Sequence, residues 1–264
     1  MQQPIHTTKE HTLDPAFVRT QLDAFKAEYP SLEVARIAAL IPAYMEEDNV
    51  GAVLDAMPAE VHGIPVMTIV LVDGGTDRTA AVSREHGAYV LELSENIGQG
   101  SAFQIGYRLC IELGVEIIVT LDADGQNDPA EIPIMVEPIL EDQADFVVAS
   151  RRLGVDTTTD RFRKLGVRTF SAIMNAMTGA KLTDTSNGYR AFKTAMVADV
   201  VDRLKQPQFQ TAELLITSLR RGWRVDERPT LWHPRASGTT KKGKNWKFGF
   251  NYAKVVFATY WRER

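Results

Sequence analysis

The sequence predicts an α/β fold, namely a doubly wound, mostly parallel sheet flanked by helices, with a more helical C-terminal portion. Three observations lead to this prediction. After Pro30, short apolar, β-branched runs alternate with segments of helical period, and this repetition is typical of a parallel sheet. Four of the runs end in clusters of polar residues, which is where open α/β sheets bind ligands. In the second half of the chain, helical patterns dominate.

The first predicted element is a helix that begins after Asp14-Pro15. Asp14 is a typical N-cap and Pro15 suits the first helical position. Apolar residues then follow at a spacing that defines one helix face: Val18, Leu22, Phe25 and Tyr29.

Strands and helices alternate after this helix. We expect strands near 35–41, 66–72, 88–92, 116–122 and 145–150. We expect helices between them near 47–57, 77–86, 99–113 and 129–141. The second half is expected to form helices near 162–178, 192–204, 211–221 and 246–261, and a strand at 224–231. With no linker or repeat in the chain, we expect an N-terminal tail and helix (1–30), one large domain (31–240) and a C-terminal helix (241–264).

Composition excludes several classes of protein. With 264 residues, 44% of them hydrophobic, the chain can bury a substantial core. Its net charge of −4 argues against general nucleic-acid binding. The single cysteine, Cys110, rules out an internal disulfide or a CxxC metal site. Neither a signal peptide nor an apolar run of about 18 residues is found, so we expect a cytoplasmic protein.

The C-terminal segment 241–264 differs in charge from the rest of the chain. It contains seven basic residues and one acidic residue, together with seven aromatic residues. This combination suits peripheral contact with the cytoplasmic face of a membrane, or an anionic substrate. A closing helix that packs its aromatic side chains on the core explains the same pattern. Both interpretations remain open.

Paired carboxylates follow the apolar run 116–121. Asp122 and Asp124 are two residues apart, so we expect their side chains to point the same way at the carboxyl end of the strand. Two adjacent carboxylates repel each other unless a cation lies between them. A divalent metal site is one interpretation, and a simple strand-to-turn transition is the other.

Four polar segments follow one another along the chain: Ile41–Glu47, Val72–Thr79, Asn96–Gly100 and Asp122–Gln126. In this order they resemble the signatures of family 2 glycosyltransferases, which have the GT-A nucleotide-sugar-binding fold. Further segments follow at Ser150–Arg152, Thr183–Arg190, Glu213 and Arg235–Lys241. These later segments resemble the polyprenyl-phosphate sugar transferases, the dolichol-phosphate mannose synthase group.

The resemblance implies an inverting, metal-dependent transfer from a UDP- or GDP-sugar donor. Asp122, Asp124 and Gln126 would lie around Mg²⁺ or Mn²⁺ and the diphosphate, because hard oxygen ligands suit these ions. The donor-binding set comprises Pro42, Tyr44, Glu46, Asp73, Asp122, Asp124 and Gln126. Alternatively, Pro42–Tyr44 is a plain turn and Asp73 caps the 77–86 helix. The family usually has Asn where Met45 stands and often Lys where Gln99 stands.

Basic residues of the later segments would meet the acceptor or its phosphate, because Arg suits bidentate phosphate contacts. They are Arg151, Arg163, Arg168, Arg190, Arg235 and Lys241. Solvated surface charge is the alternative. The expected catalytic set is Asp124, Arg151, Asp184 and Glu213. A hydroxyl acceptor requires a general base, and Asp184 or Glu213 would supply it, whereas a phosphate acceptor is already an anion and requires none.

The leading hypothesis is therefore transfer of a sugar to a polyprenyl phosphate. A soluble acceptor, such as a small metabolite, a nucleoside or a natural product, is the second hypothesis. A nucleotide-sugar-binding protein without catalysis is the third. The sequence does not identify the sugar, the base or the oligomeric state.

Overall fold

The computed structural model describes residues 10–157, 161–234 and 245–264. Within these ranges the chain forms an eight-stranded sheet in the order β2-β3-β1-β5-β7-β6-β8, with β4 also paired to β3. Its strands are β1 (Ile37–Ala43), β2 (Glu60–Val61), β3 (Ile64–Val72), β4 (Tyr89–Glu92), β5 (Ile117–Thr120), β6 (Phe146–Asp156), β7 (Arg190–Lys193) and β8 (Val225–Trp232). The neighbours of β1 run parallel to it, as do β4 to β3 and β8 to β6. The predicted doubly wound, mostly parallel sheet is confirmed.

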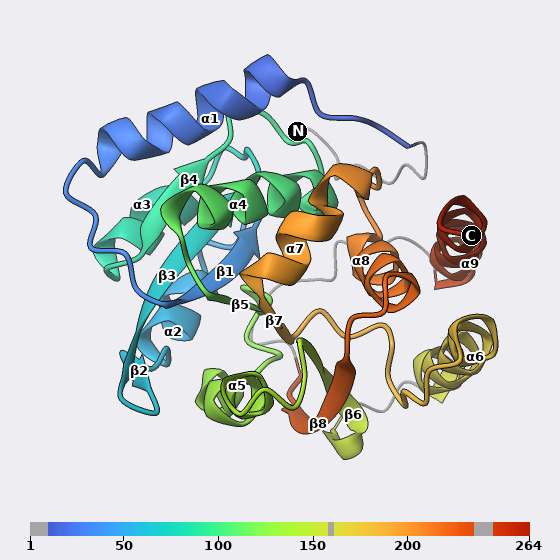
Figure 1. Ribbon diagram of the computed structural model, residues 1–264. Helices are drawn as coiled ribbons and strands as arrows, with labels where there is room; N and C mark the ends of the chain where they lie inside the picture. Colours follow the sequence, from blue (N-terminus) through green and yellow to red (C-terminus); the bar gives the residue numbers. More distant parts are fainter. Residues whose placement is uncertain (1–9, 158–160, 235–244) are drawn as a thin grey trace.

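Helices cover the sheet and extend beyond its last strands. They are α1 (Pro15–Glu28), α2 (Val50–Asp55), α3 (Thr79–Glu85), α4 (Gln99–Leu113), α5 (Ile132–Leu140), α6 (Arg161–Thr178), α7 (Thr194–Val200), α8 (Gln210–Arg220) and α9 (Asn245–Arg262), with 3-10 turns η1 (Pro129–Glu131) and η2 (Val201–Arg203). Figure 1 shows α1 and α4 over the sheet, and α6 and α9 at the side farthest from β2. The more helical C-terminal portion is thus confirmed.

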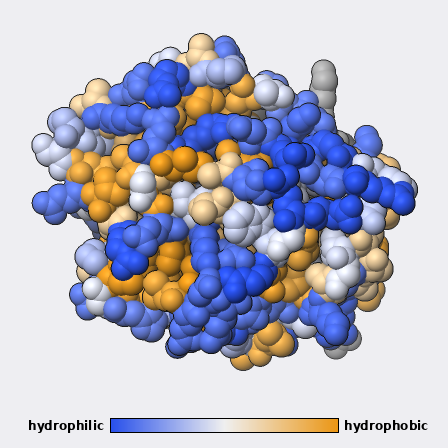
Figure 2. Space-filling view, viewed as in Figure 1, coloured by the Kyte–Doolittle hydropathy of each residue, from blue (hydrophilic) through white to orange (hydrophobic). Residues whose placement is uncertain are grey.

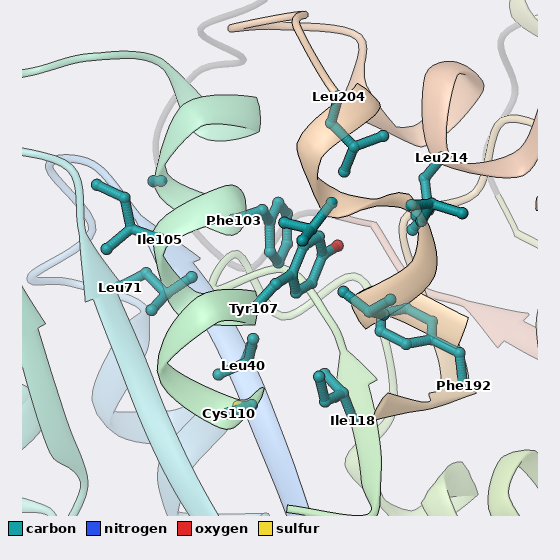
Figure 3. Packing of buried hydrophobic residues seen from close by; sticks show 14 of the residues in the cluster. Leu40, Leu71, Phe103, Ile105, Tyr107, Cys110, Ile118, Phe192, Leu204 and Leu214 are labelled. Carbon is teal, nitrogen blue, oxygen red and sulfur yellow. The ribbon is translucent and has the colours of Figure 1, made fainter. Parts of the chain in front are cut away.

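The core divides into two clusters because successive residues of a strand face opposite sides of the sheet. Leu40 of β1 belongs to the cluster that contains Phe103 and Tyr107 of α4 (Figure 3). Its neighbour Ile41 belongs to the cluster that contains Val53 of α2. Every residue of β1 is buried, as expected for a central parallel strand with helices on both faces.

The first and last helices both contribute to the larger core cluster. Leu22 and Phe25 of α1 and Tyr252 and Val255 of α9 are buried in it. Phe170 of α6 packs on Tyr252 with ring centroids 4.9 Å apart. One face of α9 therefore packs on the core, as one interpretation of the tail predicted.

The strand β7 corrects the prediction of a helix over 192–204. Residues Arg190–Lys193 pair antiparallel with both β5 and β6, and helix α7 begins only at Thr194. These four residues form a strand because they pair with two strands that lie far from them in sequence. Local sequence pattern does not reveal such pairing. Similarly, β5 ends at Thr120, so Asp122 and Asp124 lie in the following loop and the alternation of a strand does not apply to them.

Hydrophilic residues cover most of the face seen in Figure 2, and apolar residues are visible between them. Among the described helices, none combines the length and the apolarity that crossing a bilayer requires.

Candidate active site

The candidate site lies along one rim of the sheet. Because β3 and β5 run parallel to β1 on its two sides, their carboxyl ends meet at the same edge. The loops that begin at Tyr44, Asp73 and Leu121 therefore become neighbours, as the sequence predicted. The antiparallel strand β7 brings its amino-terminal end to this edge, since Arg190 pairs with Thr120.

The loop after β5 is held by hydrogen bonds of its own side chains. Asp124 Oδ1 accepts from Gln126 N at 3.1 Å, and Asn127 Oδ1 accepts from Asp122 N at 3.1 Å. Gln126 Nε2 donates to the carbonyl oxygen of His233 at 3.2 Å, and His233 N donates to Gln126 O at 3.0 Å. Asp122 and Asp124 remain partly exposed. The loop thus presents two carboxylates beside the chain that leads out of β8.

Asp122 and Asp124 offer carboxylate oxygens, the ligand type that a hard divalent cation prefers. Gln99 Nε2 donates to Asp122 Oδ1 at 3.3 Å, and a Cβ on Gly188 would lie 3.7 Å from both carboxylate oxygens of Asp122. No group of three or more His, Cys, Asp or Glu that could hold a metal ion occurs within the described ranges. Two carboxylates can supply part of an oxygen shell, and diphosphate oxygens and water would have to complete it.

Asp73 is buried at the end of β3 and fixes the start of α4. Its Oδ1 accepts from Ile97 N at 2.7 Å and its Oδ2 accepts from Gly98 N at 2.9 Å. Burial raises the pKa of Asp73 to about 6, although these two N–H groups act in the opposite direction. Asp73 does not cap the helix after it, because Asp77 accepts from Thr79 N.

The loop after β1 is joined to the loop after β3. Glu46 is buried, its Oε2 accepts from Asn49 Nδ2 at 2.8 Å, and its N–H donates to Thr79 Oγ1 at 2.9 Å. Met45 has a φ of 57°, in the left-handed region that Asn tolerates better than Met, and its sulfur accepts from Thr76 N at 3.4 Å. Of the predicted nucleoside-binding residues here, Pro42 is buried within β1 and Tyr44 is partly exposed just after it.

Arg151 and Asp184 form a buried ion pair. Arg151 Nε and Nη2 donate to the two carboxylate oxygens of Asp184 at 2.5 and 2.8 Å, and Nη2 also donates to Ser186 Oγ at 2.8 Å. The guanidinium lies 4.9 Å from the ring centroid of Trp232. Burial alone would raise the pKa of Asp184, but Arg151 and two backbone N–H groups hold it below its ordinary value.

Arg190 and Glu213 are also buried and fully engaged. Arg190 Nε, Nη1 and Nη2 donate to the carbonyl oxygens of Asn187, Thr211 and Thr185 at 2.7, 2.6 and 3.1 Å. Burial lowers the pKa of Arg190 to about 10. Burial raises the pKa of Glu213, whose carboxylate nevertheless accepts four hydrogen bonds from two backbone N–H groups and from Arg262.

The other predicted phosphate-binding residues are spread between α6 and the chain after β8. Arg163 lies in the first turn of α6, and Arg168 is exposed one and a half turns further along. Arg235 and Lys241 lie outside the described residues. His233, however, is joined to Gln126, so the described chain after β8 passes the carboxylate loop.

Two residues of this region were not predicted as members of the site. Arg152 is exposed next to the buried Arg151, at the point where β6 changes from buried to exposed residues. No alternation of apolar and polar residues in β6 marks this change, so the sequence offered no signal that separates the two arginines. His233 is partly exposed beside Gln126. No local pattern marks it, because its position depends on a contact between residues more than 100 positions apart.

Comparison with known proteins identifies the family. The model of glycosyl transferase family 2 matches residues 38–201, more than half of the chain. The chain belongs to this family. It is therefore a glycosyltransferase, and the resemblance seen in its sequence motifs is confirmed.

Relatives of this glycosyltransferase include enzymes named for lipid acceptors. It is 29% identical over 217 residues to an undecaprenyl-phosphate mannosyltransferase of Micrococcus luteus, covering 78% of this chain and 87% of the relative. It is 27% identical over 210 residues to a UDP-N-acetylglucosamine–dolichyl-phosphate N-acetylglucosaminyltransferase of Methanococcus voltae, covering 72% and 82%.

Solved structures confirm the GT-A fold of the glycosyltransferase. Glucosyl-3-phosphoglycerate synthase from Mycobacterium tuberculosis, in complex with Mn²⁺, UDP and phosphoglyceric acid, superposes with a TM-score of 0.65 at 19% identity. The superposition covers 96% of this chain and 84% of the synthase. The same synthase was also crystallised with Mg²⁺ and UDP.

Proposed function

We propose that this glycosyltransferase moves a sugar from a nucleotide donor to a polyprenyl phosphate, with inversion at the anomeric carbon and with a divalent cation. One observation carries the choice of acceptor. Asp184 and Glu213, the two predicted general bases, are both fully buried and hydrogen-bonded in ion pairs with arginines. A hydroxyl acceptor requires a base near its proton, whereas a phosphate oxygen is already a nucleophilic anion.

Each side chain of the rim then has a distinct task. Asp122 and Asp124 would hold Mg²⁺ or Mn²⁺, with Gln126 bracing their loop. When bound, the cation supplies charge stabilisation for the departing nucleoside diphosphate. Asp73, Glu46, Tyr44 and Pro42 would form the nucleoside side, where Asp73 is ionised above its pKa of about 6 and can accept hydrogen bonds.

The transfer itself is a single displacement. An acceptor phosphate oxygen forms a bond to the anomeric carbon as the bond from that carbon to the diphosphate breaks. This chain's task is to hold the two anionic substrates together, which requires cations on the acceptor side. The exposed Arg152 and Arg168 can meet a phosphate that arrives from solvent or from a lipid surface. Arg151, by contrast, would support the loop 184–186 through its ion pair.

The outer face of α9 supports a lipid-bound acceptor. Phe250, Phe257 and Trp261 are 65%, 45% and 62% exposed and recur on one side of the helix. Lys254 is exposed on the same side, and Arg264 lies 5.0 Å from the Trp261 ring. Exposed aromatic side chains next to cations suit the interface of an anionic membrane.

Product analysis tests the acceptor. The purified protein would be incubated with Mn²⁺, a panel of UDP- and GDP-sugars, and either undecaprenyl phosphate or soluble hydroxyl acceptors including phosphoglycerate. We expect an acid-labile sugar phosphate on the lipid and loss of turnover with chelator. If only a soluble hydroxyl acceptor receives the sugar, the proposed lipid acceptor is wrong. If transfer proceeds without a divalent metal ion, the proposed cation is wrong.

Vesicle sedimentation tests the membrane contact. Changing Phe250, Phe257 and Trp261 together to Ser should abolish binding to vesicles that contain phosphatidylglycerol, and added salt should weaken binding of the wild type. The matched control changes Val34, in the loop before β1, and Ile134 of α5, which are exposed apolar residues away from α9. Equal loss of binding in the control would show that the α9 face is not the contact.

A further inference from the structure

The buried carboxylate of Glu213 joins α9 to the segment before α8. Its Oε1 accepts from Arg262 Nη2 at 2.7 Å and from Lys205 N at 2.9 Å. Its Oε2 accepts from Lys205 N at 3.0 Å and from Gln206 N at 2.9 Å. Arg262 also pairs with Glu10 at 2.8 Å, in the chain that precedes α1. The last turn of α9 is therefore fastened to the backbone of 205–206 through one carboxylate.

The segment 205–207 in turn packs directly on the start of α4. Gly100 N donates to Pro207 O at 2.8 Å. A Cβ on Gly98 would lie 2.4 Å from Pro207 O, and a Cβ on Gly100 would lie 2.2 Å from Gln206 O. Two backbones approach here so closely that only glycine fits. A shift of 205–207 must consequently move the first residues of α4.

The stretch 97–99, which leads into α4, reaches the rim. Ile97 N and Gly98 N donate to Asp73. Gln99 Nε2 donates to Asp122 Oδ1. The same short stretch thus touches the nucleoside side of the site and one of the two carboxylates of the loop after β5.

We propose that Arg262 and Glu213 are positioning residues for the donor side. The pair holds 205–207 in place, this segment holds the start of α4, and α4 orients Asp73 and Asp122. Glu213 then acts through backbone contacts at a distance from the substrates. The inference rests on the proposed function, because it assigns the pair a role in binding nucleotide and metal.

Hydrogen–deuterium exchange of the full-length protein without ligand tests the mechanical step. In Arg262→Met, the amides of residues 97–101 should exchange roughly tenfold faster, while those of β1 stay protected. Arg262→Lys keeps a cation and should restore much of the protection. The matched control is Arg203→Met, which removes an ion pair to Glu263 near the same end of α9 without touching Glu213. Equal exchange at 97–101 in wild type and Arg262→Met, or equal acceleration in the control, overturns the inference.

Calorimetric titration with UDP and GDP in the presence of Mn²⁺ tests the functional step. Arg262→Met should raise the Kd of whichever nucleotide binds the wild type about tenfold. Removing residues that support metal ligands typically weakens binding by about 10- to 100-fold, and we expect the lower value. Arg262→Lys should recover most of the affinity, and Arg203→Met should retain it. If Arg262→Met binds the nucleotide as tightly as the wild type, the positioning role is wrong, but the proposed function is not affected. If the wild type binds neither nucleotide, the proposed function is wrong, and with it the role of the pair in donor binding.

Discussion

The carboxylates on the two sides of the candidate site have opposite surroundings, although sequence motifs assign all of them to one site. Asp122 and Asp124 lie in a loop and are partly exposed; Asp124 accepts from the backbone N–H of Gln126, and Asp122 accepts from the side-chain amide of Gln99. Asp184 and Glu213 are fully buried and paired with Arg151 and Arg262. The first pair lies within reach of solvent. The second pair is already neutralised by the protein itself.

The sequence motifs therefore identify the residue types, while burial determines whether a carboxylate can bind a ligand. A charged group in contact with solvent can exchange water for a substrate at little cost. A buried ion pair must first be broken, which costs several kcal/mol. We therefore expect substitutions on the loop of Asp122 and Asp124 to affect catalysis, and substitutions in the buried pairs to affect folding or positioning.

The largest effect is expected on the exposed side. Asp124→Asn keeps an oxygen that can accept from Gln126 N but removes the charge that would hold the cation. We expect kcat to fall roughly 10²- to 10³-fold, with the melting temperature unchanged. The matched control is Asp128→Asn in the same loop, because Asn preserves the hydrogen bond to Ala130 N. A wild-type rate in Asp124→Asn would remove the contrast between the two sides.

The second effect concerns the buried side. Arg151→Met leaves Asp184 without its cation in a fully buried position, so we expect a loss of about 3–5 kcal/mol in the free energy of unfolding, measured in urea. Arg36→Met is the matched control. It breaks a pair with Glu116 of similar geometry whose side chains are both exposed, and it should change stability little. Similar losses in the two variants would contradict the importance of burial.

Asp73 combines features of the exposed and the buried carboxylates. It is buried, but it accepts its hydrogen bonds from two backbone N–H groups and not from an arginine. Its pKa is raised from 3.8 in the unfolded chain to about 6 in the native state. The native state therefore binds the proton more tightly, and the stability linked to this group is present below pH 3.8 and is lost as the pH rises through 6. Relative to Asp73→Asn, the wild type should lose up to about 3 kcal/mol between pH 4 and 7. A difference between the two proteins that is independent of pH would show that Asp73 is not desolvated.

The smallest effect is expected at Met45, in the loop after β1. Asn adopts its left-handed backbone more easily than Met, so Met45→Asn should raise the free energy of unfolding by about 0.5–1 kcal/mol, measured by thermal melting. Met45→Leu keeps the backbone cost and should give no gain. Equal stability of the two variants would mean that the left-handed backbone at this position costs Leu no more than Asn.

Sequence patterns predicted the fold well where one helix or strand carries its own signal. The apolar run of β1 and the glycine-flanked α4 fall close to their expected bounds, because burial on both faces and helix-ending glycine are visible locally. Strand β7 was missed because four residues take their conformation from neighbours on both sides. The same reason explains why the burial of Arg151, Arg190 and Glu213 was not foreseen. Asp184 lies 33 positions from Arg151 and Arg262 lies 49 positions from Glu213, while Arg190 is buried as part of the strand that was missed. The residue types were therefore predictable, but their environments were not.

The reversed direction of β7 has a consequence for how this enzyme could acquire other acceptors. Because β7 begins where β5 ends, the turn at Ser186–Gly188 that leads into it meets the same edge as the loops that lead out of β1, β3 and β5. The chain then leaves β7 at the opposite end and enters α7. Changes of length in this turn would reshape this part of the rim while the register of the sheet and the helix behind it stay the same. In an all-parallel sheet, the turn that leads into a strand lies at the edge opposite the candidate site. The antiparallel strand β7 therefore adds a loop to the site that evolution, or a protein engineer, can vary.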